Sequence, residues 1–195
     1  MSDLMRMITN DNHFGFARYG DEAMGVIASN DQHGLRRCLL KGLEHRQLGY
    51  WIGTPADPVH AKLFDRLVSR RYRQVMDQDA LITSQFGRRL AEHLKANLNT
   101  TVMWVSKKDP PNELVLVVDE WLEVGEWDQW EQVRRMTFPR NTLVLIDAGL
   151  VGTCLATNWF SRSPRCTVID MTGVWNAAPS SSAVAAPVLP TDSQS

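Results

Sequence analysis

Charged residues gather at the end of the first stretch of sequence that has the composition of a β-strand. Residues 14–19 (FGFARY) are mostly apolar, Gly20 follows as a turn, and Asp21 and Glu22 open a segment with helical spacing. In open α/β sheets, ligands bind beyond the carboxyl ends of the strands, where helix N-termini present free N–H groups. Arg18, at that end, is suited to gripping a phosphate with two hydrogen bonds. Without a ligand, Asp21 would serve as a helix cap and Glu22 as a favourable first-turn charge.

A second candidate lies near the C-terminus, in the segment LVLIDAGLVGT (143–153). Gly149 and Gly152 fall in a predicted strand-to-helix turn, and Asp170 ends the next predicted strand. Glycines there would let the backbone approach a phosphate or ribose, and the acid would bind ribose hydroxyls, as in enzymes that use a nucleotide or S-adenosylmethionine. The dinucleotide fingerprint needs a third glycine where this chain has Asp147. A tight helix–strand contact is the alternative role for Gly152.

Strand-like and helix-like segments that would position these residues alternate along the chain. Their alternation, with runs such as LVLVV that are apolar on both faces, predicts an α/β fold: a Rossmann-like, mostly parallel sheet with helices on both faces. The predicted strands cover residues 14–19, 50–53, 80–84, 101–106, 114–119, 142–149 and 166–170, and the helical segments cover 33–47, 58–76, 84–98 and 152–162.

One connection does not fit a parallel crossover. KKDPPNE (107–113) contains two prolines and is too short for a helix, so residues 101–106 and 114–119 are expected to form an antiparallel hairpin at one edge of the sheet. From residue 176 the sequence turns to Ala, Pro and Ser without any period, which predicts a disordered tail over 176–195 after a single domain over 1–175.

Several short motifs, in this order, resemble the GT-D type of bacterial glycosyltransferases. RYGD (18–21) before an apolar helix is similar to their ARYGDGE motif, and YWIGTP (50–55) resembles their YxVGIP strand and turn. Residues 80–94 have the layout of their next strand, turn and helix. Residues 143–173 are similar to their strand, AGP turn, helix and final IDIG strand. The resemblance covers residues 14–173.

This resemblance implies a metal-dependent enzyme that transfers a sugar from a nucleotide-sugar donor to an unknown acceptor. A departing nucleoside diphosphate gathers negative charge, which a divalent cation neutralises, and oxygen ligands suit Mg²⁺ or Mn²⁺. Asp21 and Glu22 are the implied metal-binding and catalytic residues. The donor-binding residues expected from the motifs and turns are Arg18, Gly20, Asn30, Asp31, Gly149, Gly152 and Asp170.

The sequence departs from the family pattern at the second carboxylate. Asp21 aligns with the Asp of the motif, but Glu22 falls on its Gly and Ala23 on its Glu. Neighbours in an extended segment face opposite sides, so Asp21 and Glu22 share an ion only if the turn twists sharply between them. The His that typically follows IDIG is also missing, since this chain continues with 171–174 (MTGV). A second hypothesis is therefore an inactive member of the fold that acts as a binding or interaction module.

An acceptor site is suggested by the acidic, tryptophan-rich segment DEWLEVGEWDQWEQ (119–132). Asp119 follows the predicted strand 114–119 and is a candidate base for activating the acceptor. Aromatic faces flanked by carboxylates are common in sugar binding. Alternatively, the three tryptophans pack a helix while the acids face water; they are Trp121, Trp127 and Trp130.

Composition excludes several classes of protein. The 195 residues are 44% hydrophobic and 22% charged, which is typical of a globular chain. Twenty-one Lys and Arg against 22 Asp and Glu give a formal net charge of −1, so no overall positive field attracts nucleic acid. No apolar run is long enough for a membrane span or a signal peptide, and a cytoplasmic location is expected.

Overall fold

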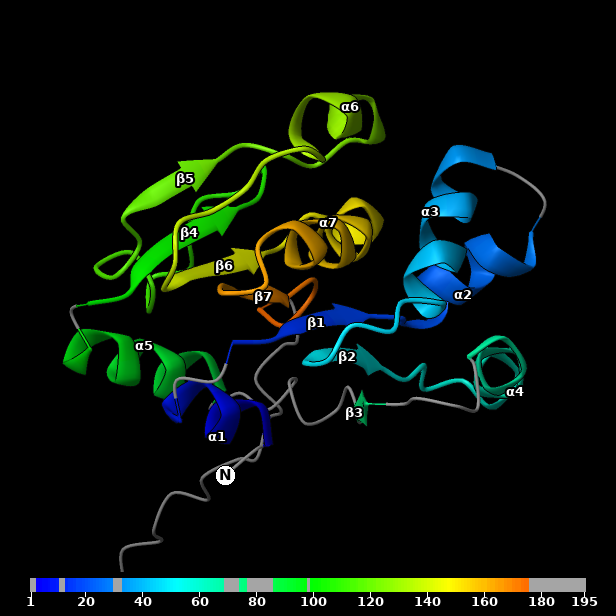
Figure 1. The fold of residues 1–195 in the computed structure, drawn as a ribbon, viewed down its shortest axis with the longest axis horizontal. Coiled ribbons are helices and arrows are strands. Elements are labelled where there is room, and N and C mark those ends of the chain that lie inside the picture. Colours follow the sequence, from blue (N-terminus) through cyan, green and yellow to red (C-terminus); the bar gives the residue numbers. More distant parts are fainter. Residues whose placement is uncertain are drawn as a thin grey trace, which may run out of the picture.

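The computed structural model describes residues 3–10, 13–29, 33–68, 74–76, 86–97 and 99–175. Seven strands in these residues form one sheet in the order β3-β2-β1-β7-β6-β4-β5, and each pairing between neighbours is parallel (Figure 1). The predicted α/β class is therefore confirmed. The strands are β1 (Gly15–Arg18), β2 (Tyr50–Gly53), β3 (Val75–Met76), β4 (Thr101–Val105), β5 (Glu120–Leu122), β6 (Thr142–Ile146) and β7 (Thr167–Asp170).

Helices cover both faces of this sheet, as the doubly apolar strands predict. In β6, Val144 and Ile146 point into one apolar core, while Leu143 and Leu145 point into the other. The first core is closed mainly by α2 (Asp21–Ala28), α3 (His33–Leu43), α4 (Pro58–Leu67), α6 (Trp130–Val133) and α7 (Gly149–Arg162). The second is closed by α1 (Asp3–Thr9) and α5 (Phe86–Ala96), which lie side by side (Figure 1).

The expected edge hairpin is wrong. Residues 114–119 form no strand; the chain coils through turns in which the N–H groups of Leu114 and Val115 donate to Pro111 O at 2.8 and 3.1 Å. β5 then runs parallel to β4. A parallel partner requires the chain to return to the amino end of β4, and this coil makes that return, with Leu114 buried as its anchor in the second core.

One predicted helix is shorter in the structure, and three other predictions concern residues that the structure does not describe. The helical segment predicted over 58–76 ends early, because α4 stops at Leu67, Val68 is extended, and Val75–Met76 form β3. The predicted strand over 80–84, the residues Asn30 and Asp31, and the tail over 176–195 lie outside the described residues. In the described part of the chain, no helix combines the length and apolar character that crossing a membrane would require.

Candidate functional site

The carboxyl ends of β4 and β6 lie side by side, but the chain leaves them over opposite faces of the sheet. After β4, residues 106–119 return across the second core, where Leu114 is buried; after β6, α7 packs over the first core. Neighbouring strands whose connections diverge in this way open a crevice, and in open α/β sheets that crevice is the usual ligand site. The topology alone therefore directs attention to the loops after Val105 and Ile146.

A cavity of about 410 Å³ occupies this position, and we call it the β4–β6 cavity. Its volume lies in the range of small-molecule sites. Polar and charged side chains of both signs line it together with one aromatic ring and the first turn of α7. The lining residues are Glu22, Ser106, Lys107, Lys108, Gly125, Glu126, Trp127, Asp147, Ala148, Gly149, Leu150, Val151 and Thr172.

The first turn of α7 forms the back of the β4–β6 cavity. Gly149, the first residue of this helix, has a φ of +57°, a conformation that favours glycine, and a Cβ built on it would meet no atom within 4 Å. The capping position, Ala148, has no side chain to bond the free N–H groups of this turn. The start of a 14-residue helix and the open space at Gly149 suit the approach of an anionic group.

Two lysines that follow β4 and a tryptophan that follows β5 line the cavity. Lys107 makes an ion pair with Glu126, and both side chains are largely exposed. The ring of Trp127 stacks on that of Trp130, with centroids 5.0 Å apart and an interplanar angle of 15°. Lys108 is exposed at the same rim. Cations and an aromatic face thus stand next to each other.

Glu22 and Asp147 bring two carboxylates to the β4–β6 cavity from different strands. Asp147 follows β6, where its N–H donates to Val105 O at 2.8 Å and its Oδ1 accepts from Gly173 N at 3.3 Å. Glu22 reaches the cavity from the start of α2, after β1. Of the two carboxylates predicted to bind the metal ion, Asp21 and Glu22, the cavity is therefore lined by Glu22, which departs from the family motif.

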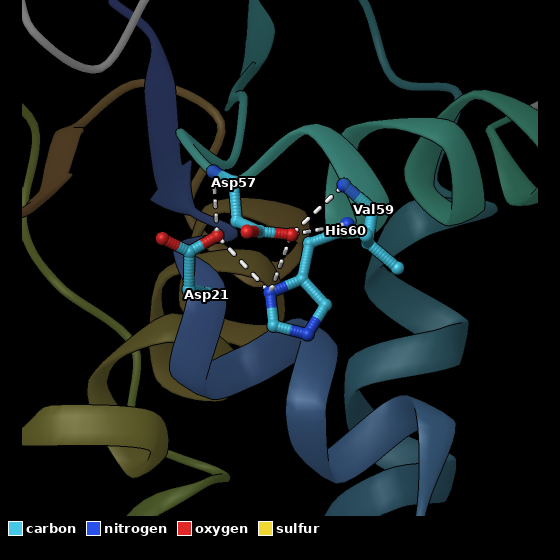
Figure 2. Close-up of polar contacts among 4 residues, drawn as sticks. All are labelled: Asp21, Asp57, Val59 and His60. Atoms are coloured by element: carbon cyan, nitrogen blue, oxygen red, sulfur yellow. Dashed lines mark hydrogen bonds and ion pairs between the residues drawn. The ribbon is translucent and has the colours of Figure 1, made fainter.

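Asp21 points to a different neighbour. Its Oδ1 accepts hydrogen bonds from Asp57 N at 3.0 Å and from His60 Nδ1 at 3.1 Å (Figure 2). Gly20 occupies the cap position of α2 and no side chain caps the helix, so the cap interpretation of Asp21 is wrong. Asp21 instead ties the start of α2 to the start of α4.

Asp57 is the cap of α4 and completes this tie. Its Oδ1 accepts from Val59 N at 2.8 Å and from His60 N at 3.0 Å (Figure 2). The hydrogen bond from the His60 N–H, followed by the one from Val59, lowers the pKa of Asp57. Asp57 thus receives helix N–H groups on its side chain and donates its own N–H to Asp21. The polar groups over the ends of β1 and β2 are largely engaged with one another.

Asp170 is fully buried and joins β1, β7 and α7. Its Oδ2 accepts from Arg18 N at 3.1 Å and from Thr153 Oγ1 at 2.8 Å, and its Oδ1 accepts from Thr172 N at 3.1 Å. Burial raises the pKa of Asp170, although the hydrogen bonds from Thr172 and Thr153 and the nearby charge of Arg18 oppose the rise. These bonds use both oxygens, which gives no support to a role in binding a ribose.

Gly152 and Arg18 surround this buried carboxylate. A Cβ on Gly152 would lie 2.9 Å from Ile146 Cγ2, so the glycine lets α7 pack directly on β6, as in the helix–strand contact considered for it. Arg18 Nε is buried and has no hydrogen-bond partner among the residues described. Arg18 Nη1 lies 3.6 Å from where a Cβ on Gly173 would stand, so its guanidinium lies under the turn after β7.

Asp119 is not brought to the β4–β6 cavity. Its Oδ2 accepts from Val102 N at 2.8 Å, and its N–H donates to Val102 O at 2.9 Å. These bonds hold Asp119 beside the beginning of β4, at the amino edge of the sheet. Because the strand expected before Asp119 is a coil and β5 begins after it, the residue precedes its strand instead of following it.

A second cavity, of about 550 Å³, lies at that amino edge and includes His13, His93 and Asn97 in its wall. It contains none of the residues predicted as functional. The carboxyl ends of parallel strands and the N-termini of the following helices point the other way. The smaller β4–β6 cavity is therefore the stronger candidate.

The β4–β6 cavity contains two side chains that could ligate the metal ion implied by the family resemblance. The described residues contain no group of three His, Cys, Asp or Glu side chains able to hold an ion. Mg²⁺ in phosphate sites, however, is commonly bound by one or two carboxylates together with the phosphates of the substrate. Glu22 and Asp147, which share the cavity, fit that description. Asp21 Oδ1 is already occupied by two donors.

Several cavity residues were not predicted, although the rule that identified Arg18 would have identified them too. Lys107 and Lys108 come directly after the strand ending at Val105, and Asp147 comes directly after Ile146. Both lysines follow the predicted strand 101–106, and Asp147 falls near the carboxyl end of the predicted strand 142–149. His60 had no comparable signal, because its partner Asp21 is 39 positions away in the sequence.

One solved structure resembles this chain throughout most of its length. It is described as the highly conserved domain of unknown function 1792, which has a distinct glycosyltransferase fold. The TM-score is 0.59 at 12% sequence identity, and the match covers 87% of this chain and 76% of that one. No family model and no curated protein matches the sequence. At this identity the likeness shows the fold, and it confirms the fold that the sequence motifs imply.

Proposed function

We propose that this protein is a glycosyltransferase that binds a nucleotide-sugar donor in the β4–β6 cavity and transfers its sugar to an acceptor. The observation that carries the proposal is the position of that cavity, at the point where the connections after β4 and β6 diverge in a fold shared with a glycosyltransferase domain. The cavity also has the two kinds of group that a nucleotide sugar needs: cations for its phosphates, and hydrogen-bonding side chains for its hydroxyl groups.

The diphosphate of the donor would lie between Lys108 and the first turn of α7. Lys108 and the first turn of α7 line the same cavity, and an ammonium group and the free N–H groups of a helix start both stabilise negative charge. Charge builds on the diphosphate as the bond to the sugar breaks, so groups fixed around it lower the barrier to transfer. Lys107 can join them, because an exposed ion pair such as Lys107–Glu126 contributes little and exchanges readily.

A divalent cation would bind at Glu22 and Asp147, the two carboxylates of the cavity that form no ion pair with a lysine in the described part of the chain. When bound, such a cation neutralises charge on the phosphates. Among the described residues, three carboxylates and two lysines line the cavity, an excess of one negative charge, which favours a cation arriving with an anionic donor. The family motif assigns the ion to Asp21, and that assignment is the competing one.

Arg18 and Asp170 would support the site from below. The guanidinium and the buried carboxylate lie under the turn after β7, and Thr172 in that turn lines the cavity. Asp170 holds the N–H of Thr172, so it fixes that part of the wall. We therefore assign both residues to the scaffold of the donor site, with Gly152 setting the distance between α7 and β6.

The test is binding of a nucleoside diphosphate to the full chain, measured by thermal shift and calorimetry with UDP and GDP, each with Mn²⁺ or with EDTA. The wild type is expected to bind at least one of them, and Lys108→Gln should weaken that binding several-fold because an ammonium contact is lost. Lys95→Gln, on α5 at the opposite face, is the matched control and should leave the affinity unchanged.

Hydrolysis or transfer of the sugar from the corresponding nucleotide sugar then separates an enzyme from a binding module. Binding without any turnover would favour the second hypothesis, an inactive member of the fold. If neither nucleotide binds under either condition, the proposed function is wrong.

A further inference from the structure

Trp127 is the one aromatic residue that the described part of the chain contributes to the wall of the β4–β6 cavity, and two contacts fix its position. One face of its indole ring is covered by Trp130 at 5.0 Å and 15°. Gly34, in the first turn of α3, lies against an edge of the ring: a Cβ there would be 3.2 Å from Cζ2 and 3.3 Å from Nε1 of Trp127. The ring is held in place while part of it remains open to the cavity.

We infer that Trp127 is the platform on which the base of the donor nucleotide stacks. An aromatic side chain binds a nucleobase through its face, and the gain is much the same for every base because each has a π-face. A ring that is already fixed by Trp130 and Gly34 loses little freedom when a ligand arrives. The inference rests on the proposed function, since it presumes a nucleotide in this cavity.

The surroundings of Trp127 favour a nucleotide over an isolated apolar group. Lys107 and Lys108 lie in the same wall, at the end of β4, and Trp127 follows the Glu126 that pairs with Lys107. A base on the indole would thus have its phosphates next to lysines and to the first turn of α7. An aromatic ring, cations and a helix N-terminus thus line one cavity, and these are the groups that the base and the diphosphate of a nucleotide need.

This arrangement also orients the donor. In the sheet, β7 and β6 separate β1 from β4, so Glu22, which follows β1, approaches the cavity from the side opposite the β4 loop. A base at Trp127 and a diphosphate at α7 place the sugar toward Glu22 and the start of α2. The acceptor must then reach the sugar from the β1 side of the crevice.

The experiment compares UDP, uridine and inorganic pyrophosphate as ligands of the full chain and of three variants. Trp127→Leu keeps an apolar side chain against Trp130 but removes the aromatic face, Trp127→Phe keeps a smaller face, and Trp51→Phe replaces a partly buried tryptophan that packs in the second core. Affinities come from calorimetry, and quenching of tryptophan fluorescence by uridine or UDP provides a second readout.

Trp127→Leu is expected to weaken UDP and uridine about tenfold while leaving pyrophosphate unchanged, because only the stacking is lost. Trp127→Phe should keep most of the affinity but lose most of the fluorescence quenching, and Trp51→Phe should behave as the wild type. If UDP binds the wild type and Trp127→Leu leaves its affinity unchanged, the inference falls and the proposed function stands. Equal weakening of pyrophosphate would mean that the cavity has collapsed, which also overturns the inference.

Two further outcomes would also overturn the inference. If UDP binds as well to Trp127→Leu as to the wild type while a free hexose binds only to the wild type, Trp127 belongs to the acceptor site and the inference is wrong. If the wild type binds no UDP, GDP or uridine with or without Mn²⁺, the proposed function and this inference fail together.

Discussion

The two halves of the carboxyl edge of the sheet use polar residues in opposite ways. Over β1 and β2, Asp21, Asp57 and His60 bond one another and one another's helix N-termini (Figure 2). In the β4–β6 cavity, Glu22 from the start of α2 and Asp147 from the end of β6 share the wall with two lysines. Charged side chains at strand ends are therefore not equivalent: those that satisfy each other hold the loops, and those that face a cavity remain available to a ligand.

Asp21 and Glu22 show how sharply this division can fall. They are adjacent in the sequence, yet Asp21 bonds the start of α4 while Glu22 lines the β4–β6 cavity. Both lie in the first turn of α2, where successive residues are turned by about 100° around the helix axis. A charged pair at a helix start thus serves two neighbours at once, one on each side of β1.

Removing the buried carboxylate should produce the largest loss of stability. Asp170→Ala leaves the N–H groups of Arg18 and Thr172 without their acceptor in the core, while the hydroxyl of Thr153 keeps Arg18 O as an acceptor at 3.0 Å. We expect the free energy of unfolding to fall by about 3 kcal/mol. Urea unfolding measures it, as a lower midpoint at unchanged slope. A loss below about 1 kcal/mol would contradict the role of Asp170 as the tie between β1 and β7.

Asp170 should also make stability depend on pH with a defined sign. Burial raises its pKa above the ordinary value of 3.8, so the folded state binds the proton more tightly than the unfolded state. The resulting stabilisation is complete below the unfolded pKa and is lost as the pH rises through the folded pKa. The wild type minus Asp170→Asn difference in unfolding free energy should therefore be greatest at acid pH and decline as the pH rises. A difference that grows with pH would reverse the assignment.

The contact between α7 and β6 should be the next most sensitive. Gly152→Ala places a methyl group 2.9 Å from Ile146 Cγ2 in a packed core, which should cost about 2 kcal/mol. Gly25→Ala in α2 is the control: its Cβ meets nothing within 4 Å, and replacing a helical glycine should stabilise by about 0.5 to 1 kcal/mol. Thermal unfolding of both variants measures the pair, and equal effects would show that Gly152 is not a contact point.

Much of the sheet could be predicted from the sequence, because β4 and β6 are short runs that are apolar on both faces, as strands buried between two layers of helices must be. Residues 114–119 have the same pattern and form a coil, while Glu120–Leu122, with an acid and an exposed tryptophan, form β5. Local preference was overridden there by the need to return to the amino edge, and Leu116 is 81% exposed as a result. A single sequence contains no signal for that choice.

The candidate site divides in the same way. Glu22 and Gly149 were found from strand ends and turns, which are local features. The hydrogen-bond partners of Asp21 could not be predicted from the sequence, because Asp57 and His60 lie 36 and 39 positions further along the chain. Local sequence suggested that Asp21 caps its own helix, but in the structure Asp21 joins α2 to α4.

The tie between α2 and α4 should contribute less than the buried carboxylate, because it is partly exposed. Asp21→Ala removes the acceptor of Asp57 N and His60 Nδ1 and should cost about 1 kcal/mol, while Asp21→Asn keeps an acceptor oxygen and should cost less. A double-mutant cycle with His60→Ala isolates their contact, for which we expect a coupling of about 0.5 kcal/mol. If the two substitutions change the free energy of unfolding additively, His60 contributes nothing to the contact between α2 and α4.

Glu22→Gln should change stability least, by less than about 0.5 kcal/mol, since the side chain is exposed. Its effect should appear only with ligand. If Glu22 and Asp147 hold the cation, UDP with Mn²⁺ at 100 times its dissociation constant adds about 2.7 kcal/mol to the wild type, and the Mn²⁺-dependent part of that gain should disappear in Glu22→Gln and in Asp147→Asn. Asp21→Asn should retain it. The reverse pattern, with Asp21→Asn losing the Mn²⁺ effect and Glu22→Gln keeping it, would return the cation to the position that the family motif gives it and would place the ligand on the β1 side of the edge.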